Sequence, residues 1–137
     1  TVAATFIPSV FSAYRRIVSG PSGGNSVSNI LFENSTSGKV QSYDASNLGI
    51  TSNAAALNSI NNAAMRYTGS AAGISLNGGG VATAVGGADF STQTSYYIGN
   101  NNSGAAADWL NGYIQRLAIY PFAASDAQLQ SISSGNF

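Results

Sequence analysis

The sequence contains no cysteine and no histidine, and only 7% of its 137 residues are charged. Without cysteine the chain cannot form disulfide bonds or thiolate metal sites. The absence of cysteine does not show whether the protein works in a reducing or an oxidising compartment, because secreted proteins can also lack cysteine. Without histidine and cysteine, neither a Ser-His-Asp nor a Cys-His catalytic site can form. These absences exclude two large classes of nucleophilic hydrolase.

The five basic and five acidic residues cancel to a formal net charge of zero. Soluble domains usually carry about 25% charged residues, and nucleic-acid binding needs a basic surplus. We therefore expect no nucleic-acid partner. Asn, Ser, Thr and Gly must supply the polar surface, which suits carbohydrate contact or burial in a large assembly, although it also fits an ordinary uncharged secreted protein.

No run approaches the ~20 apolar residues of a membrane helix, so we expect no membrane partner.

Carboxylates are few and widely spaced. A glycosidase needs two of them roughly 5–10 Å apart. The acidic residues are Glu33, Asp44, Asp89, Asp108 and Asp126, none within ten residues of another. We therefore expect no catalytic residues and no enzyme. Calcium prefers about six to eight oxygen ligands, of which Asp108 and the asparagines of the preceding loop supply only a few, so we expect no metal and no cofactor.

Short segments rich in alternating, β-branched or aromatic residues recur along the chain, separated by Gly, Ser and Asn. This pattern predicts strands joined by tight turns. The predicted strands span residues 2–7, 14–19, 28–33, 39–43, 63–68, 73–76, 81–85, 94–99 and 110–120, with a weaker one at 48–51. Segment 54–61 could be a helix, but its asparagines argue against one. Roughly nine short strands predict a single sandwich domain that spans residues 1–137.

Two local motifs predict a turn and a helix. Asn77-Gly78 is the commonest two-residue hairpin turn, because both positions need a positive φ. Ser125 and Gln128 form a capping box, in which the side chain of each residue bonds the backbone N–H of the other. This box predicts a C-terminal helix of about two turns that continues to Ile132.

A larger pattern covers residues 97–99 (YIG), 110–121 (LNGYIQRLAIYP) and 125–129 (SDAQL), together with 65–67 (MRY) and 73–79 (GISLNGG) upstream. It resembles the strands and closing helix of concanavalin-A-like lectin/glucanase (laminin-G-like) domains. Arg116 before Leu117 and Pro121 after Tyr120 resemble the versions found in tailed-phage virion proteins. The resemblance implies an all-β fold, an antiparallel two-sheet jelly-roll sandwich with one short C-terminal helix.

Within such a fold, the strand 110–120 needs a β-bulge. Ile114, Leu117 and Ile119 can share the core if a bulge falls at Gln115-Arg116. Without it, Ile114 and Leu117 would point to opposite faces of the sheet. The closing helix is then expected to cover one open end or edge of the sandwich.

Carbohydrate recognition needs an exposed aromatic ring beside amide or carboxylate groups. Trp109, at a loop-to-strand junction, is the best candidate for a stacking platform, although it would serve equally well as an edge residue that caps the core. By strand alternation, either Tyr96 or Tyr97 must face away from the core. The predicted carbohydrate site comprises Trp109, Asp108, Asn100, Asn101, Asn102 and Tyr43.

The resemblance and the low charge together suggest a non-catalytic structural or decoration domain of a virion, as a capsid cement or tail-fibre protein. It would stabilise the particle, adhere to polysaccharide, or both. Expected partners are other virion proteins and surface polysaccharide, in a homo-oligomer or larger assembly, in the virion or extracellularly. Arg15 and Arg16 are adjacent, so one points outward, either as an assembly contact or as a solvated charge. The alternatives are a carbohydrate-binding module of a secreted bacterial protein and a degenerate glycosidase.

Overall fold

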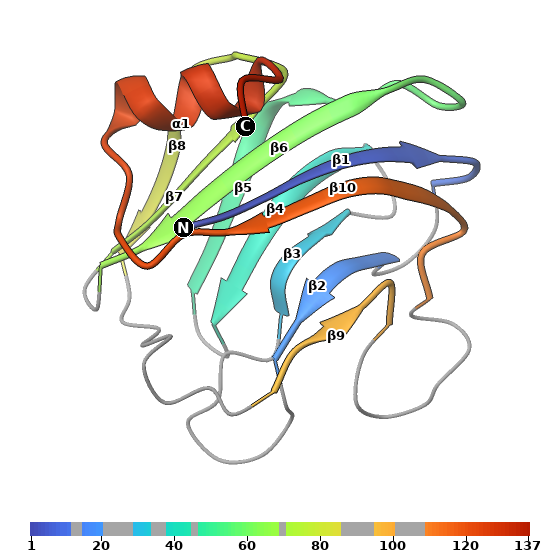
Figure 1. The fold of residues 1–137 in the computed structure, drawn as a ribbon, viewed down its shortest axis with the longest axis horizontal. Coiled ribbons are helices and arrows are strands. Elements are labelled where there is room, and N and C mark those ends of the chain that lie inside the picture. Colours follow the sequence, from blue (N-terminus) through green and yellow to red (C-terminus); the bar gives the residue numbers. More distant parts are fainter. Residues whose placement is uncertain are drawn as a thin grey trace.

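The computed structural model describes residues 1–11, 15–20, 29–33, 38–44, 47–68, 71–85, 95–100 and 109–137. These residues form two five-stranded antiparallel sheets with one helix outside them (Figure 1). Sheet A has the strand order β10-β1-β6-β7-β8, and sheet B has the order β5-β4-β3-β2-β9. The predicted two-sheet sandwich with a C-terminal helix is confirmed. The elements are β1 (Val2–Pro8), β2 (Arg15–Ser19), β3 (Asn29–Glu33), β4 (Lys39–Asp44), β5 (Asn47–Ala54), β6 (Asn61–Tyr67), β7 (Ala71–Leu76), β8 (Ala82–Val85), β9 (Tyr97–Ile98), β10 (Gly112–Ile119) and α1 (Asp126–Ser133).

The main core lies between the two sheets and follows strand alternation. In β1, Val2, Ala4 and Phe6 belong to this core, while Ala3 belongs to a second cluster on the other face of sheet A. Strands β2, β4, β6 and β7 add further buried side chains to the main core. Burying one large apolar side chain stabilises a fold by roughly 1.5–3 kcal/mol, so the inward face of β1 fixes its register.

Helix α1 packs on the outer face of sheet A, over β6 and β7 (Figure 1). The expectation that it covers an end or edge of the sandwich is wrong. Ala3 and Ala64 leave room on that face for Leu129 and Ile132 of the helix. The capping box is confirmed, with Ser125 as the N-cap. No helix in the described part of the chain is long and apolar enough to cross a membrane.

The predicted bulge in β10 is present. Thr5 pairs with Arg116, but the next residue of β1 pairs with Ile114, so Gln115 is the extra residue. As a result, Ile114 and Leu117 both pack against the main core. The prediction that Ile119 also belongs to the core is wrong, because 51% of Ile119 remains exposed.

The Asn77-Gly78 turn has the expected backbone but not the expected length. The two residues have φ values of 50° and 72°, and the N–H of Gly79 bonds the carbonyl of Leu76 at 2.9 Å. The β7–β8 pairing nevertheless stops at Ile74 and Ala82, so the connection is longer than two residues. The turn is held instead against α1, where the Gly78 N–H donates to the hydroxyl of Ser133.

Other boundaries differ modestly from the predictions. The strand expected at 94–99 is limited to β9 among the described residues, and β5 is longer than the weak strand expected there. Residues 55–60 form a turn rather than the helix considered for this segment. Buried Asn61 holds this turn, because its side chain bonds the backbone of Ala56 and Ser59.

Candidate functional site

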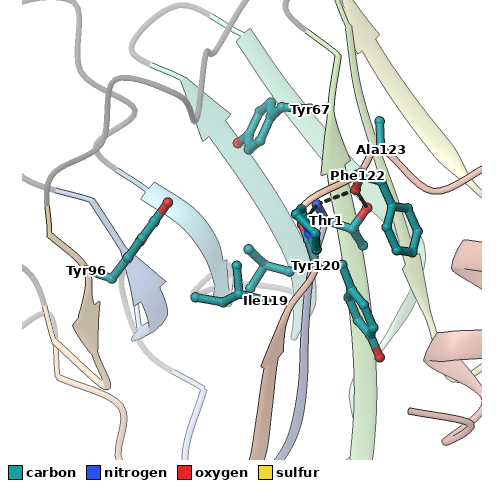
Figure 2. Close-up of a pocket in the computed structure, with 9 residues that line it drawn as sticks. Thr1, Tyr67, Tyr96, Ile119, Tyr120, Phe122 and Ala123 are labelled. Atoms are coloured by element: carbon teal, nitrogen blue, oxygen red, sulfur yellow. Dashed lines mark hydrogen bonds between the residues drawn. The ribbon is translucent and has the colours of Figure 1, made fainter.

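A pocket of about 350 Å³ lies at the end of the sandwich where β1 begins and β10 ends (Figure 2). It spans the two sheets, because most of its lining comes from sheet A and the segment after β10, while Tyr96 comes from the approach to β9 in sheet B. The described lining residues are Thr1, Val2, Tyr67, Tyr96, Ile119, Tyr120, Pro121, Phe122 and Ala123.

The floor of the pocket is a continuation of the main core. Val2 and Tyr67 belong to that core and are 1% and 7% exposed. Ile119 is the direct cross-strand partner of Val2, so both side chains leave sheet A on its inward face. Because Ile119 is half exposed, the space between the sheets reaches the surface here instead of closing over it.

Tyr96 forms the opposite wall. In Figure 2, the side chains of Tyr96, Tyr67 and Ile119 lie around the opening, whereas the rings of Tyr120 and Phe122 lie on the far side of Thr1 from Tyr96. Tyr96 is 36% exposed and lines this pocket, so the outward orientation expected for either Tyr96 or Tyr97 stays a prediction. Partial burial raises the pKa of the Tyr96 hydroxyl, so at neutral pH it is an uncharged donor and acceptor of hydrogen bonds.

The rim is held by Thr1. Its amino group donates to the carbonyls of Tyr120 and Phe122 at 3.1 and 2.8 Å. Its hydroxyl donates to the same Phe122 carbonyl and accepts from the N–H of Ala124. Burial lowers the pKa of this amino group. Each polar group of Thr1 therefore bonds the segment after β10, which fixes the shape of the rim.

The described side chains that line the pocket carry no charge. This part of the lining has no carboxylate pair, so it offers neither the acid nor the base that glycoside hydrolysis requires. Within the described ranges, no three acidic, histidine or cysteine residues gather as metal ligands would. The described side chains that line the pocket offer apolar contact, ring stacking and hydrogen bonding by hydroxyl groups.

The predicted site residues that the structure describes are not among the described lining of this pocket. Trp109 is 50% exposed and forms an isolated bridge with Arg16, at the edge of sheet B. Its carbonyl accepts from the guanidinium of Arg15 at 3.0 Å. Arg16 is only 8% exposed within its own chain, which leaves little of it for another subunit, whereas Arg15 is more exposed. The roles predicted for Trp109 and the two arginines stay predictions.

The remaining predicted residues are placed only in part. The carbonyl of Asn100 accepts from the hydroxyl of Ser19 at 2.7 Å, close to the edge strand β9. The backbone of Tyr43 pairs in β4 with Asn29 and Leu48, so it lies inside sheet B rather than on its edge. Asp108, Asn101 and Asn102 lie outside the described residues, so the predicted set as a whole stays a prediction.

Sequence reasoning missed most of this pocket. Either Tyr96 or Tyr97 was expected to face away from the core, but Ile119 was assigned to the core, and Thr1 and Tyr67 were assigned no role in a site. One signal was available, because Ile119 is the last residue of an inward-facing series and stands two residues before Pro121, where the strand must end. A large apolar side chain at such a position faces the mouth of a sandwich.

The family model described as the concanavalin A-like lectin/glucanases superfamily matches residues 1–130. No curated protein matches the sequence. Among solved structures, the chain is similar to the native heptameric SAP-like pentraxin from Limulus polyphemus, with 15% sequence identity and a TM-score of 0.69. That match covers 98% of this chain and 69% of the pentraxin chain, and it shows a shared fold.

Proposed function

We propose that this chain, which belongs to the concanavalin A-like lectin/glucanase superfamily, is a non-catalytic carbohydrate-binding domain whose site is the pocket between β10 and Tyr96. The observation that carries this proposal is the lining itself. It combines a partly exposed tyrosine ring with apolar side chains and has no charged side chain among its described residues.

Neutral sugars suit such a lining. One face of a sugar ring is made of C–H groups and its rim carries hydroxyls, so it fits an aromatic ring that has a polar tip. Tyr96 offers both features, and Ile119 faces it from sheet A. The volume of about 350 Å³ falls at the lower end of the roughly 300–1,000 Å³ usual for small-ligand pockets. One or two sugar units are therefore the expected occupants.

The rim supports binding because it is already ordered. The hydrogen bonds between Thr1 and the backbone of Tyr120, Phe122 and Ala124 fix the segment after β10. A ligand does not then have to order this backbone itself, and the entropic cost of binding falls accordingly.

The test is a glycan array probed with the purified chain and three variants. Tyr96→Ala should weaken binding to the preferred glycan by about tenfold or more, equivalent to about 1.4 kcal/mol. Tyr113→Ala is the matched control, because Tyr113 is 69% exposed on β10 and does not line the pocket. Trp109→Ala tests the site that the sequence suggested. If Trp109→Ala lost glycan binding while Tyr96→Ala kept it, the site would lie at the edge of sheet B instead.

A second candidate is a structural or decoration domain of a virion, as capsid cement or tail fibre, acting in the virion or extracellularly. It is supported by exposed apolar side chains on or next to the edge strands β9 and β10, namely Ile98, Trp109, Tyr113 and Ile119. Neighbouring subunits in an assembly could bury them. The low charge and the resemblance around Arg116 and Pro121 also support this role.

The two settings differ in self-association. A subunit of an assembly should form homo-oligomers, as the similar pentraxin, described as heptameric, does, whereas a module of a secreted bacterial protein should stay monomeric. Sedimentation of the chain over a range of concentrations separates them. Oligomers that dissociate in Ile98→Ser but persist in Leu57→Ser, which is exposed at the turn between β5 and β6, would favour the assembly role.

A further inference from the structure

We infer that the pocket selects neutral sugars that carry a methyl group, such as N-acetylated or 6-deoxy sugars, over the corresponding plain hexoses. This inference rests on the proposed carbohydrate-binding function and specifies its ligand class. It follows from the way polar and apolar groups are distributed between the rim and the floor of the pocket.

The part of the floor beside β1 and β10 is apolar, whereas Tyr67 contributes a ring and a hydroxyl on the β6 side. Val2 is almost fully buried at the base, and Ile119, its cross-strand partner, rises from it toward the opening. Pro121 and Ala123 add further apolar lining on the side that follows β10. A methyl group that enters this space exchanges water for apolar contact, which strengthens binding roughly fourfold per buried carbon.

The backbone polar groups near the floor are already engaged. The Phe122 carbonyl accepts from both the amino group and the hydroxyl of Thr1. The Tyr120 carbonyl also accepts from Thr1, and the Tyr120 N–H donates to the Thr1 carbonyl. A sugar hydroxyl pushed against Val2 and Ile119 would give up its water next to backbone groups that are already bonded, which costs affinity.

The polar group best placed for a ligand lies at the mouth. Tyr96 is partly exposed and its ring stands across the opening from Ile119. A ring stacked on Tyr96 with its hydroxyls outward would direct a methyl substituent toward Ile119 and Val2. The described lining has no acidic or basic side chain, and the amino group of Thr1 already bonds the carbonyls of Tyr120 and Phe122, so an acidic sugar gains no ion pair from the described side chains.

The test uses matched sugar pairs in NMR titrations of the ¹⁵N-labelled chain. N-acetylglucosamine is compared with glucose, and L-fucose with L-galactose, with glucuronic acid as the acidic probe. We expect the methyl-bearing member of each pair to bind at least about fourfold more tightly. We expect Tyr96→Ala to weaken both members and Tyr113→Ala to change neither.

A second variant tests the floor. Ile119→Thr keeps a β-branched side chain at a half-exposed position, so the strand should persist, but it places a hydroxyl beside the methyl site. It should weaken the methyl-bearing member of each pair more than the plain hexose, and so reduce the preference to below about twofold.

The outcomes separate the inference from the function on which it rests. Equal binding of both members of each pair, still dependent on Tyr96, would overturn the inference and leave the carbohydrate-binding function intact. Tighter binding of glucuronic acid would likewise overturn the inference. Absence of binding to every sugar here and on the glycan array would overturn both.

Discussion

Val2 and Ile119 are direct partners across β1 and β10, yet Val2 is 1% exposed and Ile119 is 51% exposed. Two side chains on the same face of one sheet therefore experience opposite environments. The difference arises because Val2 is covered by the main core, while Ile119 stands on the outermost strand of sheet A, at its C-terminal end. The pocket exists at this boundary between closed core and solvent.

Truncation of Phe6 should show how strongly the main core depends on β1. Phe6 is fully buried between the sheets, so Phe6→Ala should lower the free energy of unfolding by about 3–5 kcal/mol. Urea denaturation measures the change. Tyr113→Ala, at an exposed position on the neighbouring strand, should change the free energy of unfolding by less than about 0.5 kcal/mol. Equal losses of stability in the two variants would contradict the described core.

Deletion of Gln115 should damage the fold more than its substitution. The bulge lets Ile114 and Leu117 both face the core, and removing the extra residue would turn one of them outward. We expect the deletion to lower the free energy of unfolding, measured by urea denaturation, by at least about 2 kcal/mol. Gln115→Ala should change it only slightly. A deletion variant as stable as the substituted one would show that β10 does not need the bulge.

The capping box should contribute about 1 kcal/mol to the free energy of unfolding. Ser125 accepts from the N–H of Gln128 and the Gln128 side chain accepts from the N–H of Ser125. Ser125→Ala removes the first of these bonds and should lower the unfolding free energy accordingly. Ser131→Ala, exposed on the same helix, is the matched control and should cost less. The helix would be shown to need no cap if both variants unfolded alike.

Tyr96 should titrate above its ordinary pKa of 10.0, because burial disfavours the tyrosinate. As pH rises above 10, the unfolded chain releases this proton before the folded chain does. The stabilising contribution is thus fully present below pH 10 and is lost as pH rises through the raised pKa. The difference in tyrosinate absorbance between the parent chain and Tyr96→Phe isolates this group. A midpoint at or below 10 would contradict the partial burial of Tyr96.

The sequence predicted the local elements well where local chemistry decides them. Strand alternation predicted β1 and β10, and the capping box predicted α1. The place of the helix could not be predicted in this way, because it depends on Ala3 and Ala64 meeting on one face of sheet A. Alanine at two positions sixty-one residues apart carries no sign of what will pack on it.

The pocket was harder to predict for a related reason. Its two walls, Ile119 and Tyr96, belong to different sheets, and their approach depends on the packing of the sandwich. The pattern typical of a sugar site, an aromatic ring beside amides or a carboxylate, occurs in the sequence at Trp109. The structure instead offers a tyrosine beside apolar side chains, a pattern that resembles core when it is read along the chain.

The central claim is that the pocket beside Tyr96 binds neutral sugar, and mapping a bound oligosaccharide by NMR tests it most directly. The ligand is the preferred glycan of the array, titrated into the ¹⁵N-labelled chain. The account predicts that amide shifts concentrate at Tyr67, Tyr96 and residues 119–123, and that they disappear in Tyr96→Ala. Shifts centred on Trp109 or on the outer face near Tyr113, with no change at residues 119–123, would contradict it.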